Sequence, residues 1–229
     1  MLAVFAAVDA ALDVTAEVRD GDRVDEGATL FRLSGPTRAV LTGERAALNF
    51  LGRLSGIATQ TRRFTHAVAG TGAQVIDTRK TTPGWRLLEK GAVLAGGGAN
   101  HRVGLHDMVL VKDNHADAAG GVAIAATRAL EANDRGIPVE VEVRSLEELG
   151  EILALGVDRI LLDNMDTDSL GEAVAEARKL GSARPELEAS GGVTLSTVLE
   201  VAETGVDFIS VGALTHSAPS ADVSLRVIG

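Results

Sequence analysis

Residues 138–191 read PVEVEVRSLEELGEILALGVDRILLDNMDTDSLGEAVAEARKLGSARPELEASG, and their pattern decides the fold class. Three short apolar runs, PVEVEV, DRILLD and ELEASG, alternate with two amphipathic segments, SLEELGEILALG and DSLGEAVAEARKLG. Short buried strands that alternate with helices of this length are typical of βαβ units. The stretch therefore predicts a parallel sheet with helices on its outer side.

The same alternation extends in both directions. Further apolar runs are AQVIDT (73–78), DMVLVK (107–112) and DFISVG (207–212), and further helical segments are GGVAIAATRALEA (120–132) and TLSTVLEVAETG (194–205). We predict N-caps at Ser145, Asp168 and Thr194, and helix ends near glycines 156, 181 and 205. About six such units, without a GxGxxG turn after the first strand, favour a barrel over a doubly wound sheet.

The first part of the chain has a different pattern. Residues 14–35 alternate as strands do, with Asp-Gly and Glu-Gly turns, and residues 43–70 indicate one long helix or two. We predict a partial N-terminal sandwich domain (1–42), connecting helices (43–72), an α/β barrel (73–215) and a C-terminal segment (216–229) that returns to the sandwich. The predicted fold class is an open (β/α) barrel with a small, partly truncated α/β sandwich.

Charge is distributed unevenly. The chain has a net charge of −10, yet residues 79–112 hold six Lys or Arg against two acids, so 6 − 2 = +4. A cationic region in an acidic protein attracts small anions. The acidic balance disfavours a nucleic-acid partner, the lack of cysteine excludes disulfides, and the lack of a long apolar run or basic leader predicts a cytoplasmic protein without a membrane partner.

Each predicted strand ends in a polar group or a glycine. In α/β barrels the carboxyl ends of the strands carry the active site, so these groups should gather at one rim. The series is Asp77-Thr78-Arg79-Lys80, Lys112, Glu142, Asp163, Ser190 and Gly212.

Basic groups in this series suit carboxylates and phosphates. Arg79 offers a planar fork and Lys80 a compact charge, although adjacent bases can also be a solvated turn. After the glycines of GGGANHR, His101 and Arg102 can donate to a carboxylate, and the alternative is a flexible linker with a surface histidine. Lys112 is expected at the barrel mouth.

Acidic groups and glycines complete the predicted site. Glu142 and Asp163 suit ribose hydroxyls and hydrated Mg²⁺. The alternative is that Glu140 and Glu142, which share a strand face, form ion pairs with Lys112 and Arg102. Two glycine-containing loops, Ser190-Gly191-Gly192 and Val211-Gly212-Ala213, fit a phosphate at the last two strands.

These motifs resemble those of quinolinate phosphoribosyltransferase, the decarboxylating nicotinate-nucleotide pyrophosphorylase of NAD biosynthesis. The resemblance runs from about Asp20 onward and is carried, in order, by ERAALNFLGRLSGIAT, DTRKTTPG, GGGANHR, LVKDNH, EVEV, ILLDN, EASGGV and TGVDFISVGALTHS. Two departures are that members usually carry further residues ahead of this start, and a tyrosine where Gly91 stands.

The resemblance implies a homodimer that uses quinolinate, phosphoribosyl pyrophosphate and Mg²⁺. It implies that Arg45 enters the partner's site, that Arg79, His101, Arg102 and Lys112 hold the quinolinate carboxylates, and that Thr78 and Lys80 lie near the pyrophosphate. Glu142 and Asp163 would serve the ribose and Mg²⁺, and the two glycine loops the 5-phosphate. Alternatives are a phosphoribosyltransferase for another anionic heteroaromatic, and an impaired barrel that binds anions without turnover.

Overall fold

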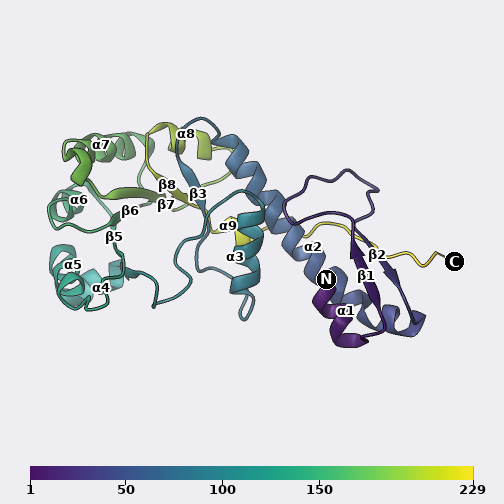
Figure 1. Cartoon of the computed structure of the whole chain (residues 1–229). Helices are drawn as coiled ribbons and strands as arrows, with labels where there is room; N and C mark the ends of the chain where they lie inside the picture. Colours follow the sequence, from purple (N-terminus) through teal and green to yellow (C-terminus); the bar gives the residue numbers. More distant parts are fainter. Residues whose placement is uncertain (229) are drawn as a thin grey trace.

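The computed structural model describes residues 1–228 and has two parts joined by one long helix (Figure 1). The larger part holds a six-stranded parallel sheet in the order β3-β8-β7-β6-β5-β4. Its strands are β3 (Gln74–Ile76), β4 (Val109–Val111), β5 (Val139–Val143), β6 (Arg159–Asp163), β7 (Glu186–Ser190) and β8 (Phe208–Ser210).

Helices lie on the outer side of this sheet (Figure 1). They are α3 (Arg86–Ala95), α4 (Asp113–Ala119), α5 (Val122–Glu131), α6 (Leu146–Ile152), α7 (Thr167–Arg178), the 3₁₀ turn η1 (Gly181–Ala183), α8 (Val198–Glu203) and α9 (Ala213–His216). Strands β3 and β4 form the two edges of the sheet, so the barrel is open between them, and residues 77–108 connect these two strands along the chain. The predicted fold class is confirmed.

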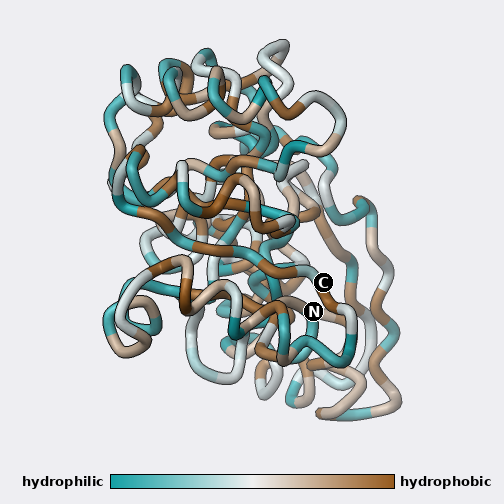
Figure 2. Tube along the Cα trace, turned by 90° about the vertical axis from the view of Figure 1, so that its left-hand side faces the viewer, coloured by the Kyte–Doolittle hydropathy of each residue, from teal (hydrophilic) through white to brown (hydrophobic). Residues whose placement is uncertain are grey.

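All six predicted strands are present because their residues are buried on both faces. Along β6, Ile160, Leu161 and Leu162 are at most 5% exposed. A continuous apolar run of this kind belongs to a parallel sheet covered by helices. Burying each such side chain stabilises the fold by about 1.5–3 kcal/mol. Figure 2 shows the apolar stretches, in brown, running through this part of the chain.

Helix boundaries follow the predictions less closely. Ser145 caps α6 as predicted, since its side chain accepts from the backbone N–H of Glu148. The predicted cap at Asp168 is wrong, because Asp166 caps α7 by accepting from Ser169. The predicted cap at Thr194 is also wrong, because residues 194–197 form a turn and α8 starts only at Val198.

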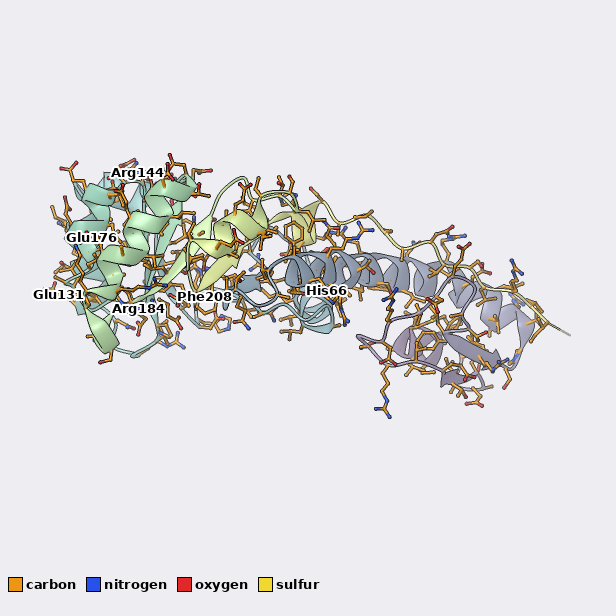
Figure 3. The ribbon with its side chains drawn as sticks, turned by 90° about the horizontal axis from the view of Figure 1, so that it is seen from above. His66, Glu131, Arg144, Glu176, Arg184 and Phe208 are labelled. Carbon is orange, nitrogen blue, oxygen red and sulfur yellow. The ribbon has the colours of Figure 1, made fainter. Side chains whose placement is uncertain are left out.

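The smaller part contains α1 (Leu2–Val8) and the antiparallel strands β1 (Asp13–Ala16) and β2 (Phe31–Ser34). Phe5 is its buried anchor, and it lies against Gly43 of α2. Helix α2 (Thr37–Ala67) is a single helix of 31 residues, which begins six residues before the predicted 43–70 segment. It runs from the small part to the barrel, where Ile57 and Phe64 join the barrel core (Figure 3).

The C-terminal segment leaves the barrel after α9 and runs back along α2 toward β1 and β2 (Figure 1). The backbone N–H of Ala221 donates to the carbonyl of Gly52 at 2.9 Å. One turn further along α2, a Cβ on Gly56 would overlap the main-chain oxygen of Pro219. Glycines at these two positions therefore allow the tail to pack directly on the helix backbone. No helix within residues 1–228 is long and apolar enough to cross a membrane.

Candidate functional site

The strand ends converge at one rim of the barrel. The loop after β3 meets the loop after β8, because the Thr215 hydroxyl donates to the main-chain oxygen of Lys80 at 2.9 Å. The Lys80 side chain also passes over Gly212, where a Cβ would lie only 3.2 Å from it. These contacts bring the predicted cationic turn and one predicted phosphate loop together.

The ends of β6 and β7 form the next part of the rim. Asp163 and Ser190 pair in register, and the backbone N–H of Asn164 donates to the Ser190 carbonyl at 2.8 Å. Asn164 has a φ of 55° and donates its amide to Asp163 at 2.7 Å. Gly191 has a φ of 97° and no room for a side chain against Asn164, so glycine is required there.

Lys112 and Glu142 meet at the ends of β4 and β5. Their Nζ and Oε2 atoms are 2.5 Å apart, and Glu142 also accepts from the backbone N–H of Asp113 at 3.3 Å. The alternative prediction is therefore confirmed for Glu142, which pairs with Lys112, whereas Glu140 lies 2.9 Å from His101 instead of pairing with Arg102. His115 caps α4 by accepting from the backbone N–H of Lys112 at 2.9 Å.

Two guanidinium groups near this rim are poorly neutralised. Arg102 is 7% exposed, and its Nε is buried without a hydrogen-bond partner. Burial, and then repulsion from nearby Arg79, lowers the pKa of Arg102. The surrounding carboxylates lie against other groups: Glu142 pairs with Lys112, Glu188 pairs with Arg159, and Glu140 lies against the His101 ring. A partly buried pair of like charges of this kind suits an anionic ligand.

Arg86 and Lys90 of the cationic region bind the protein itself. Arg86 donates to the Thr81 hydroxyl at 3.1 Å and to the carbonyls of Val103 at 2.9 Å and Arg79 at 3.3 Å. Lys90 is 2% exposed and donates to Asp77 at 2.5 Å. These two charged side chains position the loops and do not face a ligand. The count of basic residues between 79 and 112 could not reveal this difference.

His101 lies beneath the rim with both ring nitrogens next to protein groups. Its Nδ1 accepts from the backbone N–H of Arg102 at 2.7 Å. Its Nε2 lies 2.9 Å from a Glu140 carboxylate oxygen and 3.6 Å from one of Glu188. Burial lowers the pKa of His101, so the ring is neutral at pH 7. The predicted donation from His101 to a substrate carboxylate stays a prediction.

The barrel interior holds a polar layer that sequence reasoning missed in part. Glu140 and Glu188 are 0% exposed, and Nη1 of Arg159 lies 3.3 Å from Glu188. Arg159 also stacks over the Phe208 ring, 3.8 Å from its centroid. Burial, and then repulsion from Glu140, raises the pKa of Glu188 to about 8. The alternation of ELEAS, which parallels that of VEVEV, was the available signal for Glu188.

A direct metal site has weak support in this layer. Within residues 1–228, His101, Glu140 and Glu188 are the one set of three such residues whose ligand atoms lie within 4.8 Å of one another. Arg159 already supplies a cation there. The carboxylates of Glu142 and Asp163 at the rim already accept hydrogen bonds from protein groups. They therefore fit a Mg²⁺ ion bound through water molecules better than one bound directly.

Arg45 and Trp85 lie away from the rim contacts. Arg45 is exposed and lies in the first part of α2, which packs against the small N-terminal part. Trp85 stacks on Phe50 with ring centroids 4.4 Å apart, so it packs α3 against α2. Thr78 stays close to the site, since its hydroxyl accepts from the backbone N–H of Lys80 at 3.1 Å.

Comparison with known families gives two matches that together cover nearly the whole chain. Residues 1–55 match the N-terminal domain of quinolinate phosphoribosyl transferase, and residues 57–226 match its C-terminal domain. A mitochondrial quinolinate phosphoribosyltransferase [decarboxylating] from Nicotiana tabacum is 46% identical over 98% of this chain and 67% of its own length. A probable nicotinate-nucleotide pyrophosphorylase [carboxylating] from Bacillus subtilis is 43% identical over 97% and 76%.

Solved structures agree with these matches. The nicotinate-nucleotide pyrophosphorylase from Francisella tularensis superposes with a TM-score of 0.91 at 41% identity, covering 96% of this chain and 77% of that one. NadC from Streptococcus pyogenes gives the same TM-score and identity, with coverages of 99% and 79%.

Proposed function

The chain belongs to the quinolinate phosphoribosyltransferase family, and we propose that it carries out the reaction for which its relatives are named. That reaction transfers the phosphoribosyl group from phosphoribosyl pyrophosphate to quinolinate with decarboxylation. Its products are nicotinate mononucleotide, pyrophosphate and CO₂, within NAD biosynthesis. The chain is thus a pentosyltransferase with two anionic substrates.

The observation that carries this proposal is the pair of guanidinium groups of Arg79 and Arg102. The buried, unpartnered Nε of Arg102 and the repulsion from Arg79 both favour binding of a dianion. Planar guanidinium groups match carboxylates in pairs, and quinolinate carries two carboxylates on adjacent ring atoms. In this proposal Lys112, which pairs with Glu142 at the end of β4, joins the two arginines at the substrate.

The proposed chemistry requires positioning and counter-charge. The pyridine nitrogen attacks the anomeric carbon of the ribose as pyrophosphate leaves with its electron pair, through an oxocarbenium-like state. The new C–N bond makes the ring a pyridinium. That ring accepts the electrons of the breaking C–C bond when the 2-carboxylate departs as CO₂, and a proton then takes its place. No covalent nucleophile is needed.

The donor's phosphates would lie along the rest of the rim. Lys80 supports this placement, because its side chain lies against Gly212 in the loop after β8. Ser190, Gly191 and Gly192 offer backbone N–H groups after β7. Glu142 and Asp163 would hold hydrated Mg²⁺, which neutralises phosphate charge when bound.

We extend the proposal to a homodimer in which Arg45 completes the partner's site. Its support is that Arg45 is exposed and lies in the first part of α2, two residues from Gly43, which contacts Phe5 of the small N-terminal part. Location in the cytoplasm and the absence of nucleic-acid partners stay predictions from composition.

The direct test incubates the purified chain with quinolinate, phosphoribosyl pyrophosphate and Mg²⁺. We expect nicotinate mononucleotide and CO₂ in equal amounts. Parallel reactions replace quinolinate with nicotinate, which has a single carboxylate and can release no CO₂ in this way. Product from nicotinate alone would assign a sister activity, whereas quinolinate binding by calorimetry without any product would identify an impaired barrel.

A further inference from the structure

His101 holds the backbone of Arg102 in place. The N–H of Arg102 is the donor in the 2.7 Å contact, so Nδ1 of His101 must carry a lone pair and no proton. In a neutral imidazole the proton is then on Nε2. The contact geometry alone therefore assigns the tautomer.

The barrel interior favours the same tautomer. Nε2 lies 2.9 Å from Oε2 of Glu140 and 3.6 Å from Oε2 of Glu188, and both carboxyl groups are fully buried. Glu188 already accepts from Nη1 of Arg159 at 3.3 Å, whereas Oε2 of Glu140 has no hydrogen-bond partner in the present geometry, so a lone pair on Nε2 would only add repulsion at Glu140. The charged groups that face the ring from neighbouring elements are Arg102, Lys90, Arg159, Glu140 and Glu188.

The His101 main chain is fixed as firmly as its ring. Its N–H donates to Asp77 at 2.8 Å, and its carbonyl accepts from Lys90 at 2.7 Å. The side chain is 6% exposed. Every polar atom of His101 therefore has a protein group next to it, and Arg102 is the next residue outward toward the rim.

We propose that His101 is a positioning residue for Arg102, held as the Nε2–H tautomer by the Nδ1 contact with Arg102 and by the nearby Glu140 carboxylate, and that it does not donate to the substrate. The Nδ1 lone pair sets the direction of the Arg102 backbone and hence of its guanidinium. The inference rests on the proposed function, in which Arg102 binds a quinolinate carboxylate.

Nuclear magnetic resonance on protein with ¹⁵N-labelled histidine rings reads the tautomer without any activity measurement. The chain has five histidines, and the His101 signals are those that vanish in the His101→Asn variant. We expect the protonated ring nitrogen to be the one coupled to both carbon-bound ring protons, which identifies Nε2. Replacing Glu140 with Gln should raise the Nδ1–H fraction. A protonated Nδ1 in the unaltered protein would overturn the inference.

Two substitutions separate positioning from substrate binding. The Asn side chain places its oxygen near the position of Nδ1 and can still accept from Arg102, whereas the Gln side chain places its amide near Nε2. We expect His101→Asn to bind quinolinate at least about tenfold more tightly than His101→Gln, because a lost buried hydrogen bond costs this order of affinity. If His101 donates to the substrate through Nε2, the order reverses.

Calorimetric Kd values for quinolinate give the readout, with His66→Asn as control. His66 is exposed at the barrel end of α2 (Figure 3), and its replacement should leave the Kd unchanged. Thermal melts show whether each variant is folded. If the unaltered chain itself fails to bind quinolinate, the proposed function fails, and the tautomer measurement then decides the inference about His101 alone.

Discussion

Arg86 donates from Nη2 to the main-chain oxygen of Arg79 at 3.3 Å, and so it positions a residue of the proposed anion site without facing that site itself. The same guanidinium reaches the carbonyl of Val103, which follows Arg102. One side chain on α3 thus ties the loop after β3 to the loop that carries Arg102. Such a fork cannot be replaced by a single ammonium group.

Arg86→Ala should lower kcat/KM for quinolinate by at least about tenfold, since three hydrogen bonds of roughly 0.5–1.5 kcal/mol each are lost. Arg86→Lys should restore little of it, because lysine cannot reach both loops. Millimolar guanidinium ion should partly rescue the Ala variant in steady-state assays. A Lys variant with wild-type kinetics would show that only the charge matters.

Arg102→Ala should cost at least about 2–3 kcal/mol in kcat/KM for quinolinate, because a buried carboxylate of the substrate loses its partner. Steady-state kinetics with quinolinate as the varied substrate measure the loss. Arg135→Ala, at an exposed position after α5, is the matched control and should change nothing. Near-wild-type kinetics for the Arg102 variant would remove this residue from the site.

The stabilising contribution of protonated Glu188 to the folded protein should decrease as the pH rises from 6.5 to 8. Its pKa is about 8 in the folded chain against 4.5 for the free group, so in this window the folded state binds a proton that the unfolded state does not. The stabilisation is complete below pH 4.5 and is lost as pH rises to the folded pKa. The loss between pH 6.5 and 8 is about 2 kcal/mol.

Urea titrations at several pH values test this slope, and Glu188→Gln should reduce it, because the amide does not titrate, whereas Glu140, whose pKa burial also raises, keeps its own contribution. His101 does not interfere, since its pKa is lowered from 6.5 and the ring is neutral in both states above that value. Equal slopes in the two proteins would mean that Glu188 is already ionised at neutral pH.

Two glycines in helices should respond to alanine in opposite ways. Gly56→Ala should destabilise the protein by about 2 kcal/mol or more, because the new Cβ overlaps the Pro219 carbonyl and forces the C-terminal tail off α2. Gly91→Ala on α3 meets open space and should stabilise by about 0.5–1 kcal/mol. Urea denaturation measures both, and limited proteolysis reports whether the tail of the Gly56 variant is released.

The sequence predicted the repeating part of this fold well because each strand is buried on both faces and the helices have one apolar face. It failed at Asp168 and Thr194, where several hydroxyl or carboxyl side chains stand in a row and any of them could cap. The start of α2 was placed too late, because Thr37-Arg38 carry no apolar period of their own.

For the site, the strand-end pattern placed Lys80, Lys112, Glu142 and Asp163 at one rim. The roles of Arg86 and Lys90 could not be predicted, since a charge that binds a substrate and a charge that binds a carbonyl look alike in sequence. The Glu140–Glu188 pair depends on two strands separated by β6, a proximity that only the sheet order reveals.

The pairing of β3 with β8 joins Gln74 to Phe208, a separation of 208 − 74 = 134 residues. During synthesis on a ribosome, nearly the whole of the remaining chain is made before β8, the strand that pairs with β3, emerges. Contacts so distant slow folding, because a large loop must close before they form. Until β8 is in place, Lys80 after β3 lacks its contact with Gly212, so the proposed anion site forms only when the last strand joins the sheet.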